Sequence, residues 1–278
     1  AFERDLSVGA YNFLTSHVMN GQAVLPVAVI LEWFAHGALH LNPGMQFHGF
    51  DDFRVLKGVT LKADENIHLS ILAGNMVFKE TCAYVPVELR SNDQLHASAV
   101  IVLADTYEKN VLPKLQAVTG DYQFKQGEYY QNGQLFHGQH LQGIKEVLHC
   151  SDQGIVADVD SAPAPTAWMS QPIRSRWLTE PVVGDFACQR RSLWSLEQQG
   201  IGSLPTAINH YRQYQRSYPK DGARIIAEVK EHTDNRANAA IEFLDNKGQL
   251  IAIMDGYECV RDGSLQSAFK ENDLSLEA

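Results

Sequence analysis

The chain has 278 residues, 45% of them hydrophobic, which is enough for one large domain or two fused smaller ones. Its formal net charge of -10 argues against nucleic acid or a membrane surface as its main partner. The four cysteines lie far apart without a C-x-x-C pair, so we expect a reduced, cytoplasmic protein without a structural zinc site. The first residues contain no signal-peptide pattern and no initiator methionine, which predicts a piece excised from a longer chain.

The first long apolar segment, residues 23–41, predicts a buried helix. It is about as long as the ~20 residues that span a membrane, but a glutamate and two histidines interrupt it, so we expect no membrane span. Pro26 suits the first turn of a helix, and Asn42-Pro43-Gly44 ends it. Because this helix is apolar on nearly every face, other structure must wrap it, and a strongly curved sheet is the natural wrapper.

Two later segments predict β-hairpins. Residues 85–104 read as two strands around a Ser-Asn-Asp turn, and residues 239–260 read the same way around Asp-Asn-Lys-Gly. A second helix is predicted over 185–200, ending on Gly200. Each half therefore offers a helix early and a hairpin late, which predicts an α+β fold of two helix-in-sheet units.

The predicted units set the domain boundaries. We assign residues 1–115 to the N-terminal unit, 116–135 to a linker and 136–278 to the C-terminal unit, the three together forming one functional domain.

A polar residue stands just before each predicted helix. His17 precedes the first helix in the pattern His17-x-x-x-Gly21-x-x-x-x-Pro26, and Asp185 precedes the second. If a pseudo-twofold relates the halves, both side chains face one cleft, where His17 can take a proton from carbon and Asp185 can protonate a departing hydroxyl. Burial between the units would keep the carboxyl protonated. Gly21 would let a thioester carbonyl approach a backbone N–H.

These residues carry a resemblance to a known family. The His17 to Pro26 pattern resembles the HxxxGxxxxP signature of dehydratase domains of polyketide and fatty acid synthases, and residues 185–189 (DFACQ) resemble their DxxxQ/H signature. Residues 135–144 look like the family's YGPxFQGL segment, and 203–211 look like its LP-containing segment. The resemblance covers essentially the whole chain and is greatest to the dehydratase-like region of the large subunit of bacterial polyunsaturated fatty acid synthases.

The resemblance implies a double hot-dog fold, in which two curved antiparallel sheets each wrap a central helix. It implies a β-hydroxyacyl substrate on the phosphopantetheine of an acyl carrier protein and a trans-2-enoyl thioester product, with no metal and no other cofactor. His17 would be the base, Asp185 the acid and Gln189 the residue that orients Asp185. Other domains of the same megasynthase would be partners, and a homodimer is compatible with the family. The candidate substrate-binding residues are Gly21, Pro26, Tyr130, His137, Gly138, Leu141 and Pro205.

The chain also departs from the family pattern. Gln139 stands at the position of the usual proline, Leu141 at that of the usual aromatic residue, and His137 at that of the tyrosine. Three alternatives to the dehydratase therefore stay open: a product-template-like cyclase, an enoyl isomerase and a catalytically degenerate scaffold for carrier docking. Taken alone, Asp185 is most simply a helix N-cap.

Charge suggests where a carrier would dock. Acyl carrier proteins are typically acidic, and this chain is acidic too, so only a local basic patch could attract one. Arg174 and Arg176, with Arg190 and Arg191 near the second signature, form a candidate patch, and a solvated basic face is the alternative.

Overall fold

The computed structural model describes residues 1–115, 118–122, 127–131, 135–186, 189, 202–233 and 236–274. The strands of the first half are β1 (Phe2–Leu6), β4 (Gln46–Val55), β6 (Ile67–Ala73), β7 (Val77–Lys79), β8 (Cys82–Ser91) and β9 (Gln94–Ala104). Those of the second half are β10 (Ile144–Ser151), β11 (Gly154–Val159), β12 (Gly202–Gln213), β13 (Ala223–His232), β14 (Arg236–Leu244) and β15 (Leu250–Asp262). A small sheet contains β2 (Val18–Met19), β3 (Gln22–Val24) and β5 (Thr60–Leu61). The helices with defined bounds are η1 (Asn12–Ser16), α1 (Val27–Leu41), α2 (Glu128–Gln131), η2 (Gln139–Leu141), η3 (Pro165–Ala167) and α4 (Leu265–Lys270).

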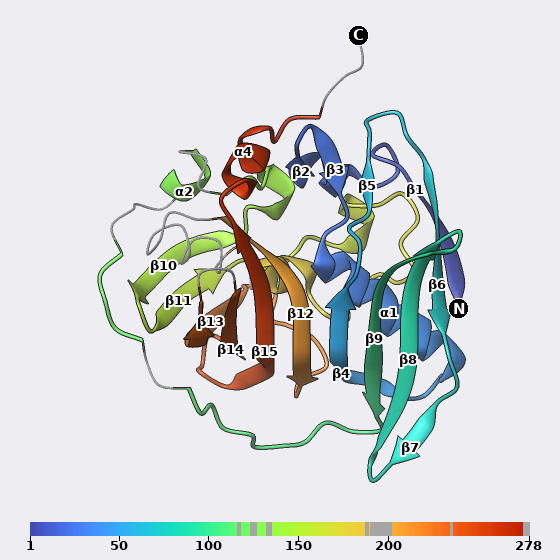
Figure 1. Ribbon diagram of the computed structural model, residues 1–278. Coiled ribbons are helices and arrows are strands. Elements are labelled where there is room, and N and C mark those ends of the chain that lie inside the picture. Colours follow the sequence, from blue (N-terminus) through green and yellow to red (C-terminus); the bar gives the residue numbers. More distant parts are fainter. Residues whose placement is uncertain are drawn as a thin grey trace.

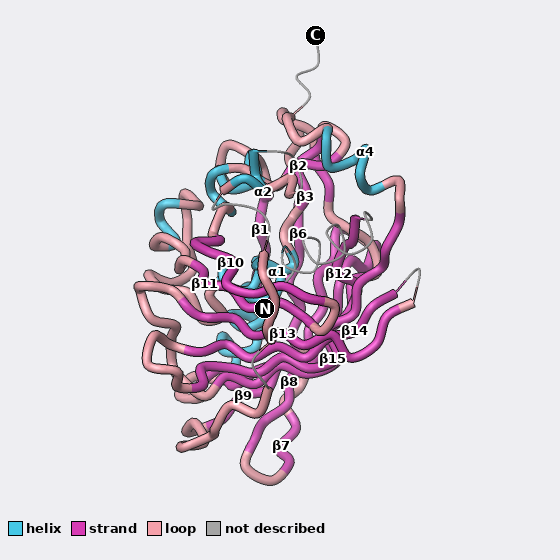
Figure 2. Tube along the Cα trace, turned by 90° about the vertical axis from the view of Figure 1, so that its left-hand side faces the viewer, coloured by secondary structure: helices cyan, strands magenta, loops and turns pink. Residues whose placement is uncertain are grey.

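The large strands form one antiparallel sheet across both halves. Its order is β1-β6-β8-β9-β4-β12-β15-β14-β13-β11-β10, with β7 added beside β8 (Figure 1). Figure 2 shows α2 and α4 together at one end of the molecule, beyond most of the strands. This large antiparallel sheet with few helices is the architecture expected of an α+β double hot-dog.

Helix α1 is the core of the first half, as its apolar sequence predicts. Twelve of its 15 residues are buried, and it packs against β4, β6, β8 and β9. Pro26 caps its start with an extended backbone, and Asn42 ends it. In the part of the chain that the structure describes, no helix has both the length and the apolar character needed to cross a membrane.

The two predicted hairpins are confirmed. β8 and β9 turn at Asn92, whose φ of 51° is the left-handed conformation that asparagine tolerates. β14 and β15 turn through residues 245–249, where Asp245 Oδ1 accepts the N–H groups of Lys247 and Gln249. Side-chain acceptors of this kind replace the ladder bonds that the turn lacks.

The second helix begins earlier than predicted. Residues 181–186 and 189 are helical, and the rest of the predicted 185–200 lies outside the described residues. Pro181 opens the helix, as proline does where its missing N–H has no helical partner. Asp185 therefore lies inside the helix, and its interpretation as an N-cap just before the helix is wrong. A Cβ on Gly184 would lie 3.4 Å from the Cβ of Ala28, so this helix closely approaches the start of α1.

Pairing of β4 with β12 joins the two halves, and we call this pairing the seam. It runs from Ala207 opposite Arg54 to Arg212 opposite Gly49. Arg212 reinforces it with a bidentate ion pair to Asp51, at 2.7 Å and 3.0 Å. Neither strand was predicted from the sequence. The assigned unit boundaries at 1–115, 116–135 and 136–278 stay a prediction, and residues 116–117, 123–126 and 132–134 of the linker lie outside the described residues.

Gly49 is expected to be essential to the seam. Its φ is +154°, and an added Cβ would lie 1.9 Å from the carbonyl oxygen of Tyr211 on β12. Gly49→Ala should therefore lower the free energy of unfolding by about 1–3 kcal/mol or more through overpacking and backbone strain. Urea denaturation would measure this, with Gly9→Ala as the control because no atom lies within 4 Å of a Cβ there. Equal stability of the two variants would contradict the prediction.

Candidate active site

A tight hairpin sets the position of His17 and explains the glycine of the motif. β2 and β3 pair through Val18 and Ala23, and the turn between them contains Asn20 and Gly21, with φ of 51° and 70°. Two consecutive left-handed residues are typical of a type I′ turn, for which Asn-Gly is the preferred pair. The hairpin places His17 beside Val24, whose N–H donates to the His17 carbonyl at 2.8 Å.

The hydrogen bond of the His17 ring defines which nitrogen carries the proton. Nδ1 lies 2.7 Å from the carbonyl oxygen of Val24, and because a carbonyl only accepts, Nδ1 must be the donor. Nε2 is then left with a lone pair that can accept a proton. Burial lowers the pKa of His17 to about 4, with the Val24 hydrogen bond acting in the opposite direction. The imidazole is therefore neutral at pH 7.

Asp185 is the acidic counterpart. It is 2% exposed, and burial raises the pKa of its carboxyl to about 7, partly offset by a hydrogen bond from Gln189. Gln189 Nε2 donates to Asp185 Oδ2 and to the carbonyl oxygen of Leu141, at 2.7 Å each. The i,i+4 spacing read from the sequence thus produces the expected contact, and the bonds of Gln189 fix the orientation of the carboxyl.

Tyr130 and the segment around Leu141 support Gln189. The Tyr130 hydroxyl donates to Gln189 Oε1 at 2.8 Å and accepts the Ile144 N–H at 3.3 Å. Leu141 contributes its carbonyl oxygen, while its side chain is 1% exposed in the core. These two candidate substrate-binding residues therefore reach the site through Gln189.

His137 lies between the base and the acid. Its Nε2 is 3.4 Å from Asp185 Oδ2, and its ring centroid is 5.3 Å from that of His17. Burial and the nearby His17 hold the pKa of His137 well below its usual value, so it is neutral at pH 7. Its Nδ1 is buried and has no hydrogen-bond partner among the described residues, which leaves one polar atom in the site available to a substrate.

Three other candidate substrate-binding residues, Gly138, Pro26 and Pro205, make contacts with the backbone or lie in regular elements of the fold. The N–H of Gly138 donates to the carbonyl oxygen of Ser16 at 2.8 Å, and a Cβ at Gly138 would lie 2.9 Å from Ser16 Cα. Only glycine allows this approach beside His17. Pro26 is buried at the start of α1. Pro205 lies in β12 opposite Cys259 of β15, and no described contact joins it to the catalytic candidates.

The structure gives Gly21 a position in the β2–β3 hairpin, and its expected role beside a thioester carbonyl stays a prediction. Its N–H donates to the carbonyl oxygen of Glu271 at 3.0 Å, and the neighbouring Asn20 N–H donates to that of Ala268 at 3.2 Å. These two bonds hold the β2–β3 turn against the C-terminal segment. The positive φ of Gly21 in this turn is a conformation that favours glycine.

An aromatic stack covers the site, and no sequence pattern indicated it. Phe136 lies 5.0 Å from the His17 ring and 4.0 Å from the His137 ring, measured between centroids. On its other side Phe136 stacks on Phe269 of α4 at 4.7 Å. The three catalytic candidates, His17, Asp185 and Gln189, and the neighbouring His137 are all less than 9% exposed under this cover.

The three titratable groups form one compact cluster. One donor atom from each of His17, His137 and Asp185 lies within 4.8 Å of the others, and among the described residues this cluster has the donor types that could hold a metal ion. Without a metal, the same neutral imidazole and protonated carboxyl form a general base opposite a general acid. That pair can remove a proton and a hydroxyl group from neighbouring carbon atoms.

Comparison with solved structures identifies the fold. The curacin synthase dehydratase domains CurF and CurK match with TM-scores of 0.72 and 0.70, at 17% and 20% identity, covering 94% of this chain and 93% and 92% of theirs. The dehydratase domain of a mycocerosic acid synthase-like polyketide synthase matches with a TM-score of 0.70 at 18% identity, covering 93% of this chain and 90% of that one. The molecule thus has the double hot-dog fold of these domains.

Sequence comparison gives the family. The model of the polyketide synthase dehydratase N-terminal domain matches residues 119–267, more than half of the chain. The chain belongs to the polyketide synthase dehydratase family and is a dehydratase domain. It is 28% identical over 255 residues to one subunit of the polyunsaturated fatty acid synthase of Thraustochytrium sp. (strain ATCC 26185 / S-3), covering 89% of this chain and only 9% of that protein.

Proposed function

We propose that this domain removes water from a β-hydroxyacyl thioester carried on the phosphopantetheine arm of an acyl carrier protein. His17 Nε2 takes the C2 proton, Asp185 gives its proton to the C3 hydroxyl, and the hydroxyl leaves as water while the C2–C3 double bond forms. The observation that carries the proposal is the pairing of a neutral imidazole with a carboxyl whose pKa is raised to about 7, within 4.8 Å in one buried site. The product is the trans-2-enoyl thioester.

Relatives of the same fold supply a parallel. A histidine-to-phenylalanine variant and an aspartate-to-asparagine variant of the CurK dehydratase are inactive mutants. This chain covers only 9% of its synthase relative, which supports a domain that works beside other domains of a multidomain synthase. We place that synthase in the cytoplasm. In such an assembly the substrate arrives covalently tethered, so a weak carrier interaction suffices.

The reaction proposed here uses protein side chains alone. A base and an acid placed on neighbouring substrate atoms account for both proton transfers, so no metal or redox cofactor enters the scheme. Treatment with a chelator should therefore leave kcat/KM unchanged. A loss that added metal restores would contradict this part of the proposal and would point to the cluster of His17, His137 and Asp185 as a metal site.

The pH dependence of activity follows from the two pKa values. The active form requires neutral His17, which exists above a pH of about 4, and protonated Asp185, which exists below a pH of about 7. We expect kcat/KM for a soluble thioester to be highest between these limits and to fall about tenfold per pH unit above pH 7. A rise in kcat/KM from pH 7 to pH 9, after correction for spontaneous thioester hydrolysis, would contradict the assigned roles.

Turnover of a defined substrate tests the function directly. The protein would be incubated with β-hydroxyacyl thioesters of several chain lengths, on carrier protein and on pantetheine, and the loss of one water would be followed by mass spectrometry. Formation of the trans-2-enoyl thioester at a rate above that of a His17→Ala protein supports the dehydratase. Double-bond migration without loss of water would favour the isomerase, and ring formation on a polyketone would favour the cyclase.

The cover over the site favours one second candidate, a catalytically degenerate scaffold. The Phe136–Phe269 stack and the contacts of α4 with the β2–β3 turn close the site from one side. Phe269→Ala separates the two functions, because it removes half of the stack without touching His17 or Asp185. An active enzyme should keep or gain turnover in this variant. Absence of turnover in both proteins, at every chain length, would establish the scaffold.

A further inference from the structure

A cavity of about 360 Å³ lies at the C-terminal end of α1, far from the catalytic cluster. Its lining is more polar than apolar, and the apolar part includes the side chains of Leu39, Met45, Phe47 and Leu178. Three arginines, Arg174, Arg176 and Arg216, also line the cavity, and no aspartate or glutamate does. We call this feature the arginine cavity.

The arginine cavity is locally basic although the molecule as a whole is acidic, with a net charge of -10. A cavity lined by three arginines and no carboxylate therefore does not follow from the overall composition. Arg176 and Arg216 are 40 positions apart, yet both their charges act on the Tyr107 hydroxyl and lower its pKa against the raising effect of burial. Among the described residues no carboxylate forms an ion pair with either arginine. Their charge is therefore available to a partner.

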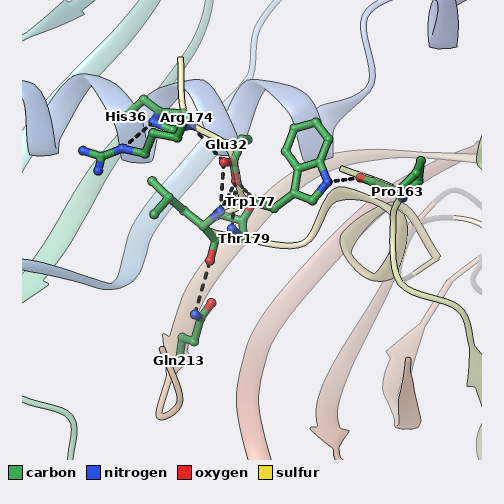
Figure 3. A network of polar contacts seen from close by, with 8 residues as sticks. Glu32, His36, Pro163, Arg174, Trp177, Thr179 and Gln213 are labelled. Atoms are coloured by element: carbon green, nitrogen blue, oxygen red, sulfur yellow. Dashed lines mark hydrogen bonds and ion pairs between the residues drawn. The ribbon is translucent and has the colours of Figure 1, made fainter. Parts of the chain in front are cut away.

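The backbone that carries two of these arginines is held firmly on α1. Arg174 Nε donates to His36 Nδ1 at 3.2 Å, and the N–H groups of Leu178 and Thr179 donate to the Glu32 carboxylate at 2.8–3.0 Å (Figure 3). Arg176 lies between these anchors. A site whose backbone is fixed in advance loses less conformational entropy on binding.

The distance from the catalytic cluster fits a tethered substrate. α1 has 15 residues, which at 1.5 Å per residue is about 22 Å. Its first turn packs beside the helix that holds Asp185, and the arginine cavity is at its last turn. A carrier that delivers its substrate on a long flexible arm docks away from His17, at a distance that the arm can span.

We propose that the arginine cavity docks an acidic, amphipathic surface of the acyl carrier protein, with one apolar side chain in the cavity and carboxylates on the three arginines. The inference rests on the proposed function and deepens it by naming the surface that its partner contacts. Charge complementarity supports this occupant, because three arginines beside a few apolar side chains match a surface on which acidic side chains stand beside an apolar one. Arg190 and Arg191 of the sequence-based patch lie outside the described residues, and Arg216 is the member that the sequence did not indicate.

Kinetics with two forms of one substrate test the proposal. The same β-hydroxyacyl group would be offered on carrier protein and on free phosphopantetheine, to the wild type, to the Arg176→Glu/Arg216→Glu double variant and to a Lys220→Glu control on an exposed position. We expect KM for the carrier-bound substrate to rise about tenfold or more in the double variant, with kcat and the KM of the free substrate unchanged. The control should match the wild type.

Other outcomes overturn the proposal. An equal rise in KM for free phosphopantetheine thioester would show that the cavity binds the phosphate and not the carrier protein. No rise beyond that of Lys220→Glu would show that the cavity is not a docking surface. If the wild type turns over no thioester, NMR titration of carrier protein up to about 1 mM tests docking independently of catalysis. Loss of binding in the double variant supports the proposal there, and absence of binding by the wild type overturns it.

Discussion

Replacing His17 by alanine is expected to lower kcat/KM for dehydration by about 10²–10⁴-fold, the usual contribution of a general base. The structure gives the reason: His17 Nδ1 is committed to the Val24 carbonyl, and Nε2 is the free acceptor beside Asp185. Asp185→Asn should cause a loss of similar size, because an amide cannot give a proton to the C3 hydroxyl. The double variant should be little worse than the worse single variant, since the two side chains act as one unit.

His96→Ala is the control that separates the loss of any buried histidine from the loss of His17. His96 is also buried, with its ring held by Ser91 and by the carbonyl oxygen of Lys57, and it has no contact with the cluster. His96→Ala should change stability and leave kcat nearly unaffected. Circular dichroism would establish that each variant is folded before rates are compared. Full activity in folded His17→Ala or Asp185→Asn proteins would contradict the mechanism.

The second large effect is expected at Glu32, in the middle of α1. This carboxylate is 1% exposed, and it accepts the N–H groups of Leu178 and Thr179, the Thr179 hydroxyl and a hydrogen bond from His36 Nε2 at 2.9 Å. Burial alone would raise the pKa of Glu32, but His36 and the N–H donors outweigh it and hold the pKa below its usual value. Glu32→Ala leaves these buried donors without partners, so we expect the free energy of unfolding to fall by about 3–5 kcal/mol.

Urea denaturation of matched variants measures this effect. Glu88 forms a surface ion pair with Arg90, in which the side chains are 40% and 32% exposed, so Glu88→Ala should cost less than about 1 kcal/mol. The contribution of Glu32 is present when the carboxyl is ionised and is lost as the pH falls through its lowered pKa in the folded state. The two variants should therefore differ most near neutral pH. Similar losses in both would contradict the expected effect.

Several parts of this molecule follow from local sequence. The apolar run before Asn42 predicts α1 because only a wrapped helix can be apolar on nearly every face. The hairpins follow from turn residues between alternating strands. The order and spacing of the two signatures identify His17, Asp185 and Gln189 as one site, and the structure places them together.

Other parts depend on tertiary contacts that no local pattern encodes. β4 was not predicted because Asp51 and Asp52 interrupt its apolar character, and the partners of Asp51, Arg212 and His210, lie across the seam on β12. The hydrogen bonds from Asn20 and Gly21 to the C-terminal segment join residues about 250 positions apart. The aromatic cover depends on α4, which at six residues is too short to show a helical period.

The seam also sets the order in which the molecule can be built. Asp51 and Arg212, which pair across it, are 161 positions apart in the chain. At synthesis rates of about 5–20 residues per second, β4 waits roughly 8–30 s for its partner strand. During that interval β4 is an open sheet edge, the kind of surface on which nascent chains pair wrongly with one another. His17 is therefore synthesised well before Asp185 and before the C-terminal segment that holds its hairpin, and the open edge of β4 is the surface that a chaperone would protect.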